Sequence, residues 1–181
     1  MKYSALAALL AISLSSLVCV TALDCYEAEF KLASRIEELE RTIRDEEYAY
    51  MYGSENSELI DNLSDDIDYK VESLSSEEAN NFLGEVLYLS QPGFRGIDND
   101  EFSISVSKVH DGVDLFNSSQ TSEEKLDALY QLKNEYSVLR DIISSYIDNK
   151  RHSIYLLNLE KFQLEEDLER VKQDCPEIYD S

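Results

Sequence analysis

The chain of 181 residues carries 16 Lys and Arg against 38 Asp and Glu, which gives a net charge of -22 at pH 7. A field of that sign repels phosphate backbones and anionic membranes and attracts basic protein surfaces, which argues against nucleic-acid binding. A hydrophobic content of 43%, with 12 Tyr and 6 Phe, is too high for a disordered acidic chain. The length suits a single domain that buries a core.

The N-terminus has the order typical of a secretory signal peptide. Lys2 precedes an apolar run from Ala5 to Ile12, and a serine-spotted apolar stretch leads to the small-residue pattern Val20-Thr-Ala22. This segment is shorter than the about 20 apolar residues that cross a membrane. We therefore expect a signal peptide at 1–22, a single mature domain at 23–181, and a secreted, extracellular protein without a membrane span.

The cysteines indicate a disulfide. Cleavage after Ala22 would remove Cys19 and leave Cys25 and Cys175 at the two ends of the mature chain. A structural zinc site needs about four Cys or His ligands, and the mature chain offers two cysteines and two scattered histidines. In an oxidising compartment, an even pair of cysteines is most simply bonded. The sequence predicts a Cys25–Cys175 disulfide, a short C-terminal tail at 175–181 and no metal site.

Helical periodicity dominates the first half of the mature chain. A first helix is predicted over 24–52, and Gly53 follows it as a stop signal. A second helix is predicted over 54–74, and the capping box Ser75-Ser-Glu-Glu78 begins a third helix that ends before a loop at 91–97. The apolar stripes of the first two helices are Leu32, Ile36, Leu39, Ile43 and Tyr50, then Ile60, Leu63, Ile67, Val71 and Leu74.

The second half is helical as well. Residues 102–107 alternate as a strand would, but the helical template accounts for more residues over 102–116, and 98–101 form a plausible N-terminal cap. The segment 123–148 has the strongest heptad stripe in the chain. The pattern slips at 148–152 and then resumes, so either the chain turns there or one helix continues through a register shift. If it turns, the terminal helices are both about 40 Å long, and antiparallel packing places Cys25 beside Cys175.

These patterns together predict one all-helical fold. We expect an antiparallel bundle of five or six helices with coiled-coil-like heptad stripes, its ends joined by the disulfide.

Catalytic and cation-binding templates do not fit the sequence. There is no glycine-rich phosphate loop, no H-E-x-x-H and no G-x-S-x-G, and the two histidines, His110 and His152, are far apart in the chain. An EF-hand loop beginning at Asp98 would place Phe102 at a ligand position. The sequence therefore predicts a protein that is not an enzyme and needs no cofactor.

Tyrosines interleaved with acids are the most distinctive local feature. In a secreted protein they are candidates for sulfation, and acids with aromatic rings suit a basic protein patch; alternatively the acids form a solvated face and the tyrosines edge the core. Two triplets also fit the N-glycosylation pattern, and the second lies in a predicted turn, which makes it the better candidate. The partner-binding candidates are Tyr48, Tyr50, Tyr52, Tyr69 and Tyr179, and the glycosylation candidates are Asn62 and Asn117.

The leading hypothesis for function is a secreted interaction protein, an effector or inhibitor that binds an extracellular, basic protein partner through an acidic, tyrosine-bearing helical surface. Two alternatives stay open: a carrier that holds a small apolar ligand between helices, and a structural coat protein that self-associates through its heptad faces.

Overall fold

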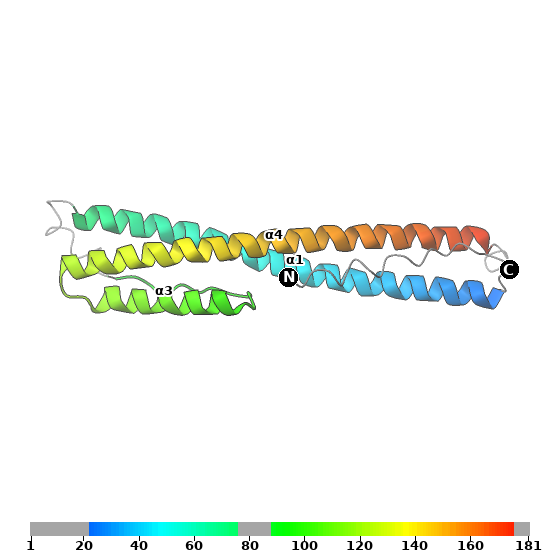
Figure 1. Ribbon diagram of the computed structural model, residues 1–181, viewed down its shortest axis with the longest axis horizontal. Helices are drawn as coiled ribbons and strands as arrows, with labels where there is room; N and C mark the ends of the chain where they lie inside the picture. The colour runs from blue at the N-terminus through cyan, green and yellow to red at the C-terminus, as the bar shows by residue number, and fades with distance from the viewer. Residues whose placement is uncertain (1–21, 76–87, 176–181) are drawn as a thin grey trace. The chain divides into compact units, whose positions relative to one another are not determined.

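The computed structural model describes residues 22–75 and 88–175, and this part of the chain contains three helices (Figure 1). They are α1 (Ala22–Ser75), α3 (Asp100–Ser118) and α4 (Ser122–Asp174). The expectation of an all-helical fold is confirmed for these residues, but the expected five or six helices are not found. The chain divides into two compact units, which we describe separately: unit 1 holds residues 22–40 and 160–175, and unit 2 is Arg41–Leu159.

Unit 2 packs segments of all three helices around one apolar core. The heptad stripe predicted for 123–148 is buried against α1 and α3, as the spacing indicates. Lys125, which the apolar pattern does not include, is also buried: its Nζ donates to the Phe116 carbonyl at 2.8 Å and closes the end of α3. The core residues are Ile60, Ile67, Leu74, Leu89, Ile97, Phe102, Val109, Val113, Phe116, Ala128, Leu129, Leu132, Tyr136, Leu139 and Ile143.

The predicted helix end at Gly53 is wrong, because α1 continues through it. A Cβ at this buried glycine would lie 2.9 Å from Ile147 Cγ1 and 3.2 Å from Tyr146 Cδ1 of α4. Glycine is needed here because α4 approaches closely, whereas the sequence pattern suggested a left-handed C-terminal residue. Among the described glycines, a positive φ is found at Gly96 in the loop before α3, where φ is 70°.

The slip at 148–152 is a register shift within one helix, since α4 runs unbroken from Ser122 to Asp174. Lys150 lies at this point and pairs with Glu46 of α1 at 3.1 Å, and its ammonium lies 5.4 Å from the centre of the Tyr146 ring. Because this segment contains neither glycine nor proline, nothing local ends the helix. The helix ends considered at Gly53 and at 148–152 are both absent, so the described part of the chain has fewer helices than expected.

The segment before α3 has no regular structure, which confirms the loop predicted at 91–97. Two asparagine side chains bind its backbone: Asn117 accepts from Leu89 N at 2.8 Å and donates to Leu89 O at 2.9 Å. Asn56 of α1 donates to Arg95 O at 2.7 Å and accepts from Arg95 N at 3.1 Å. These amides replace the backbone partners that a helix or sheet would supply.

The predicted cap before α3 is also confirmed. Asn99 is its N-cap, and the side-chain oxygen accepts from Phe102 N at 3.1 Å. The segment 102–107 is helical, as the longer pattern favours.

Unit 1 is an antiparallel pair formed by the first part of α1 and the last part of α4. The predicted disulfide is present, with the Cα atoms of Cys25 and Cys175 6.1 Å apart. Two ion pairs cross between the helices, Arg35 to Glu160 at 3.0 Å and Lys161 to Glu40 at 2.7 Å. Leu39 is buried in the seam, whereas the remaining apolar seam residues are half-buried: Leu32, Ile36, Leu164, Leu168 and Val171.

Some predictions fall outside the described residues. These are most of the signal peptide, most of the helix begun by the cap at Ser75, and the tail with Tyr179. No helix among residues 22–75 and 88–175 is long and apolar enough to cross a membrane.

Candidate interaction surface

The continuous course of α1 through Gly53 creates a stripe on its exposed side. Eight residues follow one another at alternating steps of three and four, which places them on one side of a helix, and all eight are exposed. We call this set the outer α1 stripe: Tyr48, Met51, Glu55, Glu58, Asn62, Asp65, Tyr69 and Glu72.

Two tyrosines lie near the two ends of this stripe. Tyr48 is 59% exposed and Tyr69 is 55% exposed, so both rings are largely in contact with solvent. They lie about 30 Å apart along α1 at 1.5 Å per residue. Both were predicted as partner-binding candidates, and the structure places them on the same surface.

The stripe carries negative charge that the chain does not compensate. From Asp45 to Glu72 the sequence has ten acids and one basic residue, Lys70, which is buried and lies 3.4 Å from Asp66. The basic residues of α4 that reach α1 here pair with acids outside the stripe: Lys150 with Glu46, Arg140 with Asp61 at 2.8 Å, and Lys133 with Asp68 at 2.5 Å.

In the described part of the chain, no basic side chain forms an ion pair with Glu55, Glu58 or Asp65. The outer α1 stripe therefore presents an uncompensated field to solvent.

The other predicted tyrosines have partners within the chain. Tyr50 is half-buried, with the Arg151 guanidinium 5.9 Å from its ring centre, and Arg151 lowers the pKa of its hydroxyl. Tyr52 lies against Gly96, where a Cβ would come within 2.6 Å of the ring. These two side chains have structural contacts that Tyr48 and Tyr69 do not share, and they lie off the stripe.

The two glycosylation triplets differ in environment. Asn62 lies exposed in the middle of the outer α1 stripe. Asn117 is half-buried, and both ends of its amide bind the Leu89 backbone. Asn117 also lies in the last turn of α3 rather than in the predicted turn.

The two histidines lie in different settings. His110 Nε2 lies 3.2 Å from the Pro92 carbonyl oxygen, which makes this nitrogen a donor to the loop, and His152 is exposed on α4. Within residues 22–75 and 88–175, no group of three or more Cys, His, Asp or Glu is placed to hold a metal ion.

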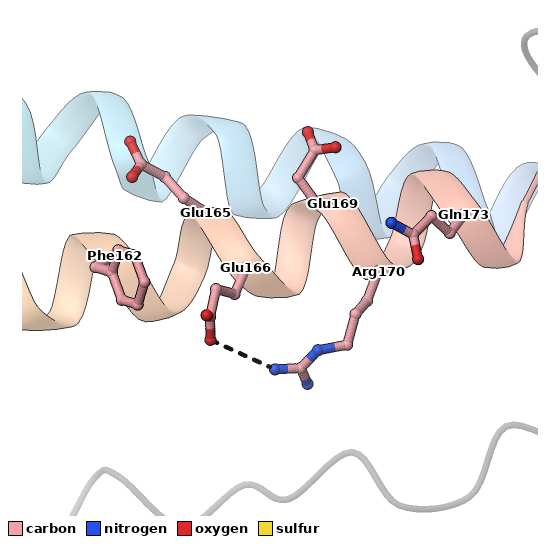
Figure 2. Close-up of a pocket in the computed structure, with 6 residues that line it drawn as sticks. All are labelled: Phe162, Glu165, Glu166, Glu169, Arg170 and Gln173. Atoms are coloured by element: carbon pink, nitrogen blue, oxygen red, sulfur yellow. Dashed lines mark ion pairs between the residues drawn. The ribbon is translucent and has the colours of Figure 1, made fainter.

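Unit 1 has a shallow depression on α4 that is open to solvent (Figure 2). Figure 2 shows that its lining comes from one helix, and the Glu166 carboxylate pairs with Arg170 at 3.9 Å. Four of the six residues around it are charged. The residues around it are Phe162, Glu165, Glu166, Glu169, Arg170 and Gln173.

Sequence reasoning missed most of the outer α1 stripe, namely Met51, Glu55, Glu58, Asp65 and Glu72. Its signal was present, since the steps of three and four continue from Tyr48 to Glu72. The predicted helix end at Gly53 divided this series into two short pieces, and neither piece stood out.

No protein-family model, curated protein or solved structure matches this chain.

Proposed function

We propose that the chain is a secreted, non-enzymatic interaction protein of the effector or inhibitor type, which binds an extracellular, basic protein through the outer α1 stripe. The observation that carries the proposal is the combination on one helix face of uncompensated acids with two exposed tyrosines. Charge speeds and orients the encounter with a basic partner, and aromatic rings supply contact area at low entropic cost.

Two further features support the extracellular location. A disulfide persists in oxidising compartments, and the chain carries one between Cys25 and Cys175. The apolar N-terminus has the order of a signal peptide.

A charge-reversal experiment tests the surface. The mature protein is immobilised, extracellular fluid is passed over it, and captured proteins are identified and purified for affinity measurements at low and high salt. We expect Glu55→Lys, Glu58→Lys and Asp65→Lys together to weaken binding at least tenfold. The matched control is Glu123→Lys, Asp127→Lys and Asp141→Lys, which changes net charge equally on exposed positions of α4.

The control should lose much less affinity than the stripe variant, because its charges lie outside the surface. Tyr48→Ala with Tyr69→Ala should weaken binding while leaving its salt dependence nearly unchanged. A partner that binds the stripe variant as well as it binds the control variant would contradict the proposal.

Self-association is a second candidate, favoured by an exposed apolar group on α4 in unit 2. Tyr155, Leu156 and Leu159 are each about half exposed or more, and they lie within about one helical turn. Light scattering at increasing concentration tests this candidate: a mass that rises for the natural protein but not for Leu159→Glu would support it.

The carrier hypothesis has less support. The core of unit 2 consists of apolar side chains packed against one another. A hollow near the end of α3 is open to solvent, and Glu124 and Asp127 are among the residues that line it. An apolar molecule that copurifies with the protein in native mass spectrometry would revive it.

A further inference from the structure

Asn62 and Asn117 both begin a triplet that an oligosaccharyltransferase recognises, Asn62-Leu-Ser64 and Asn117-Ser-Ser119. This enzyme acts on chains that have not yet folded, so sequence alone gives both triplets access to it. The folded structure treats them differently, because a modified asparagine must still fit its final environment.

The Asn117 side-chain amide is already hydrogen-bonded within the folded protein. Its oxygen and nitrogen bind the N–H and the carbonyl of the same residue, Leu89, so one edge of the amide faces that backbone. In an N-linked glycan the amide is trans, which places the first sugar carbon on the edge that also carries the oxygen. That is the edge facing Leu89, so a sugar there would break both hydrogen bonds.

Breaking this contact has a consequence for folding. Leu89 is part of the core of unit 2, and its backbone groups would lose their partners in a half-buried place. Molecules that carry a glycan on Asn117 should therefore fail to reach the folded form.

The Asn62 amide has the opposite setting. It is exposed on the outer α1 stripe, between Glu58 and Asp65, and its backbone lies within a continuous helix. A glycan bonded to its Nδ2 can extend into solvent without displacing a core contact. One helical turn on either side brings the glycan over the acids of the stripe.

We infer that Asn62 is a site of N-linked glycosylation, that Asn117 is unmodified in the folded protein, and that the Asn62 glycan covers the middle of the outer α1 stripe. The regulatory part of this inference rests on the proposed function: a glycan at Asn62 reduces partner binding, so site occupancy sets the active fraction. The attachment itself is independent of any partner. The reaction transfers an oligosaccharide from a lipid-linked pyrophosphate donor to Nδ2, forms the N–C bond, breaks the sugar–phosphate bond and releases one proton.

The test of attachment uses the whole chain behind a heterologous secretory leader in cultured animal cells. Peptide mapping of the secreted, disulfide-bonded protein, before and after enzymatic glycan removal, should show a glycan on Asn62 and none on Asn117. Asn62→Gln should abolish the glycan. A glycan on Asn117 in the folded fraction, or an empty Asn62, would overturn the inference.

The covering of the stripe is measured without a partner. Tyr69 lies about 10 Å from Asn62 along α1, so its iodination should be at least threefold slower in the glycosylated protein than in Asn62→Gln. Tyr130, which is 51% exposed on α4, serves as the internal control and should react equally in both. Equal rates at Tyr69 would refute the covering.

These readouts separate the two proposals. If Asn62 carries a glycan and Tyr69 is shielded, but the charge-reversal variant binds normally, then the proposed partner surface is wrong and the modification site still holds. If the charge-reversal variant loses binding but Asn62 is empty, the reverse applies.

Discussion

Two glycines in the loop before α3 differ in what a side chain would meet. Gly96 has φ of 70°, and a Cβ there would lie 2.6 Å from Tyr52 Cγ, whereas a Cβ on Gly93 meets nothing within 4 Å. The backbone conformation and the close ring each explain glycine at position 96 and neither explains it at 93.

Gly96→Ala should therefore lower the free energy of unfolding by about 2 kcal/mol, since a left-handed residue costs 1–2 kcal/mol and the Tyr52 ring must also move. Gly93→Ala, the matched control, should change it by less than about 0.5 kcal/mol. Urea unfolding of the three proteins measures the difference, and equal losses at both positions would contradict this account.

Tyr136 is buried in the core of unit 2, and burial, with a smaller effect of the Asp66 charge, raises the pKa of its hydroxyl to about 12. The folded pKa lies above the unfolded value of 10.0, so the unfolded state loses its proton first. The contribution of Tyr136 to the free energy of unfolding is fully present below pH 10 and is lost as the pH rises toward 12.

The free energy of unfolding falls by about 2–3 kcal/mol between pH 10 and pH 12, at 1.36 kcal/mol per pH unit. Tyr136→Phe cannot ionise and should reduce the slope of stability against pH in this window, while its stability at pH 7 stays within about 1 kcal/mol. Urea unfolding at pH 7, 10 and 11 tests it; parallel declines for both proteins would show that another group is responsible.

At the scale of the elements, a loop without regular structure depends on side chains of the helices beside it. Asn56 is 3% exposed and forms both of its hydrogen bonds with Arg95. The amide thereby satisfies one backbone donor and one backbone acceptor of Arg95 in a partly buried setting.

Asn56→Ala should lower the free energy of unfolding by about 2–3 kcal/mol, because each unsatisfied group costs 1–3 kcal/mol and water can replace part of the loss. Asn62→Ala, at an exposed position six residues further along α1, is the matched control and should be nearly neutral. Chemical unfolding compares them. Faster amide exchange at Arg95 in the Asn56 variant would show that the loop is the part released.

At the scale of the whole molecule, the two units differ in what holds them. Among the described side chains of unit 1, only Cys25, Leu39 and Cys175 are buried, whereas unit 2 has its own core. The crossing ion pairs of unit 1 involve partly exposed side chains, and such pairs contribute 0–1 kcal/mol. The disulfide closes a loop of 150 residues and contributes about 5 kcal/mol in the chain-entropy model.

Reduction by a dithiol should therefore open unit 1 and leave unit 2 folded. In proteins most helical stability comes from tertiary packing, and the unit 1 parts of α1 and α4 have little of it without the disulfide. Amide exchange should therefore accelerate at least tenfold near Cys25 and Cys175 and remain slow around Leu132 and Ile143. Hydrogen exchange with mass spectrometry, with and without reductant, measures both regions.

A variant with both Cys25→Ser and Cys175→Ser should reproduce the reduced pattern and show no further response to reductant. Unchanged exchange in unit 1 after verified reduction would mean that the seam is stable without the bond. Accelerated exchange in both units would mean that the chain unfolds as one.

Periodicity alone determined the helical class and the strong stripe from Leu129 to Tyr146, because both are properties of local spacing. The Cys25–Cys175 bond was predicted from the cysteine content together with the expected removal of Cys19. The helix ends depended on tertiary contacts, because Gly53 reads as a stop in sequence and serves in the fold to let Ile147 approach.

The candidate surface, too, was predictable from the sequence only in part. The sequence supplied the acids and tyrosines, but the face that Tyr48 and Tyr69 share exists only because α1 is continuous. Likewise, no local pattern indicates that Asn56 and Asn117 bind a distant loop or that Lys125 closes α3. Spacing along one helix can be read from the chain, whereas a polar contact between distant segments is decided only when the packed structure brings the two groups together.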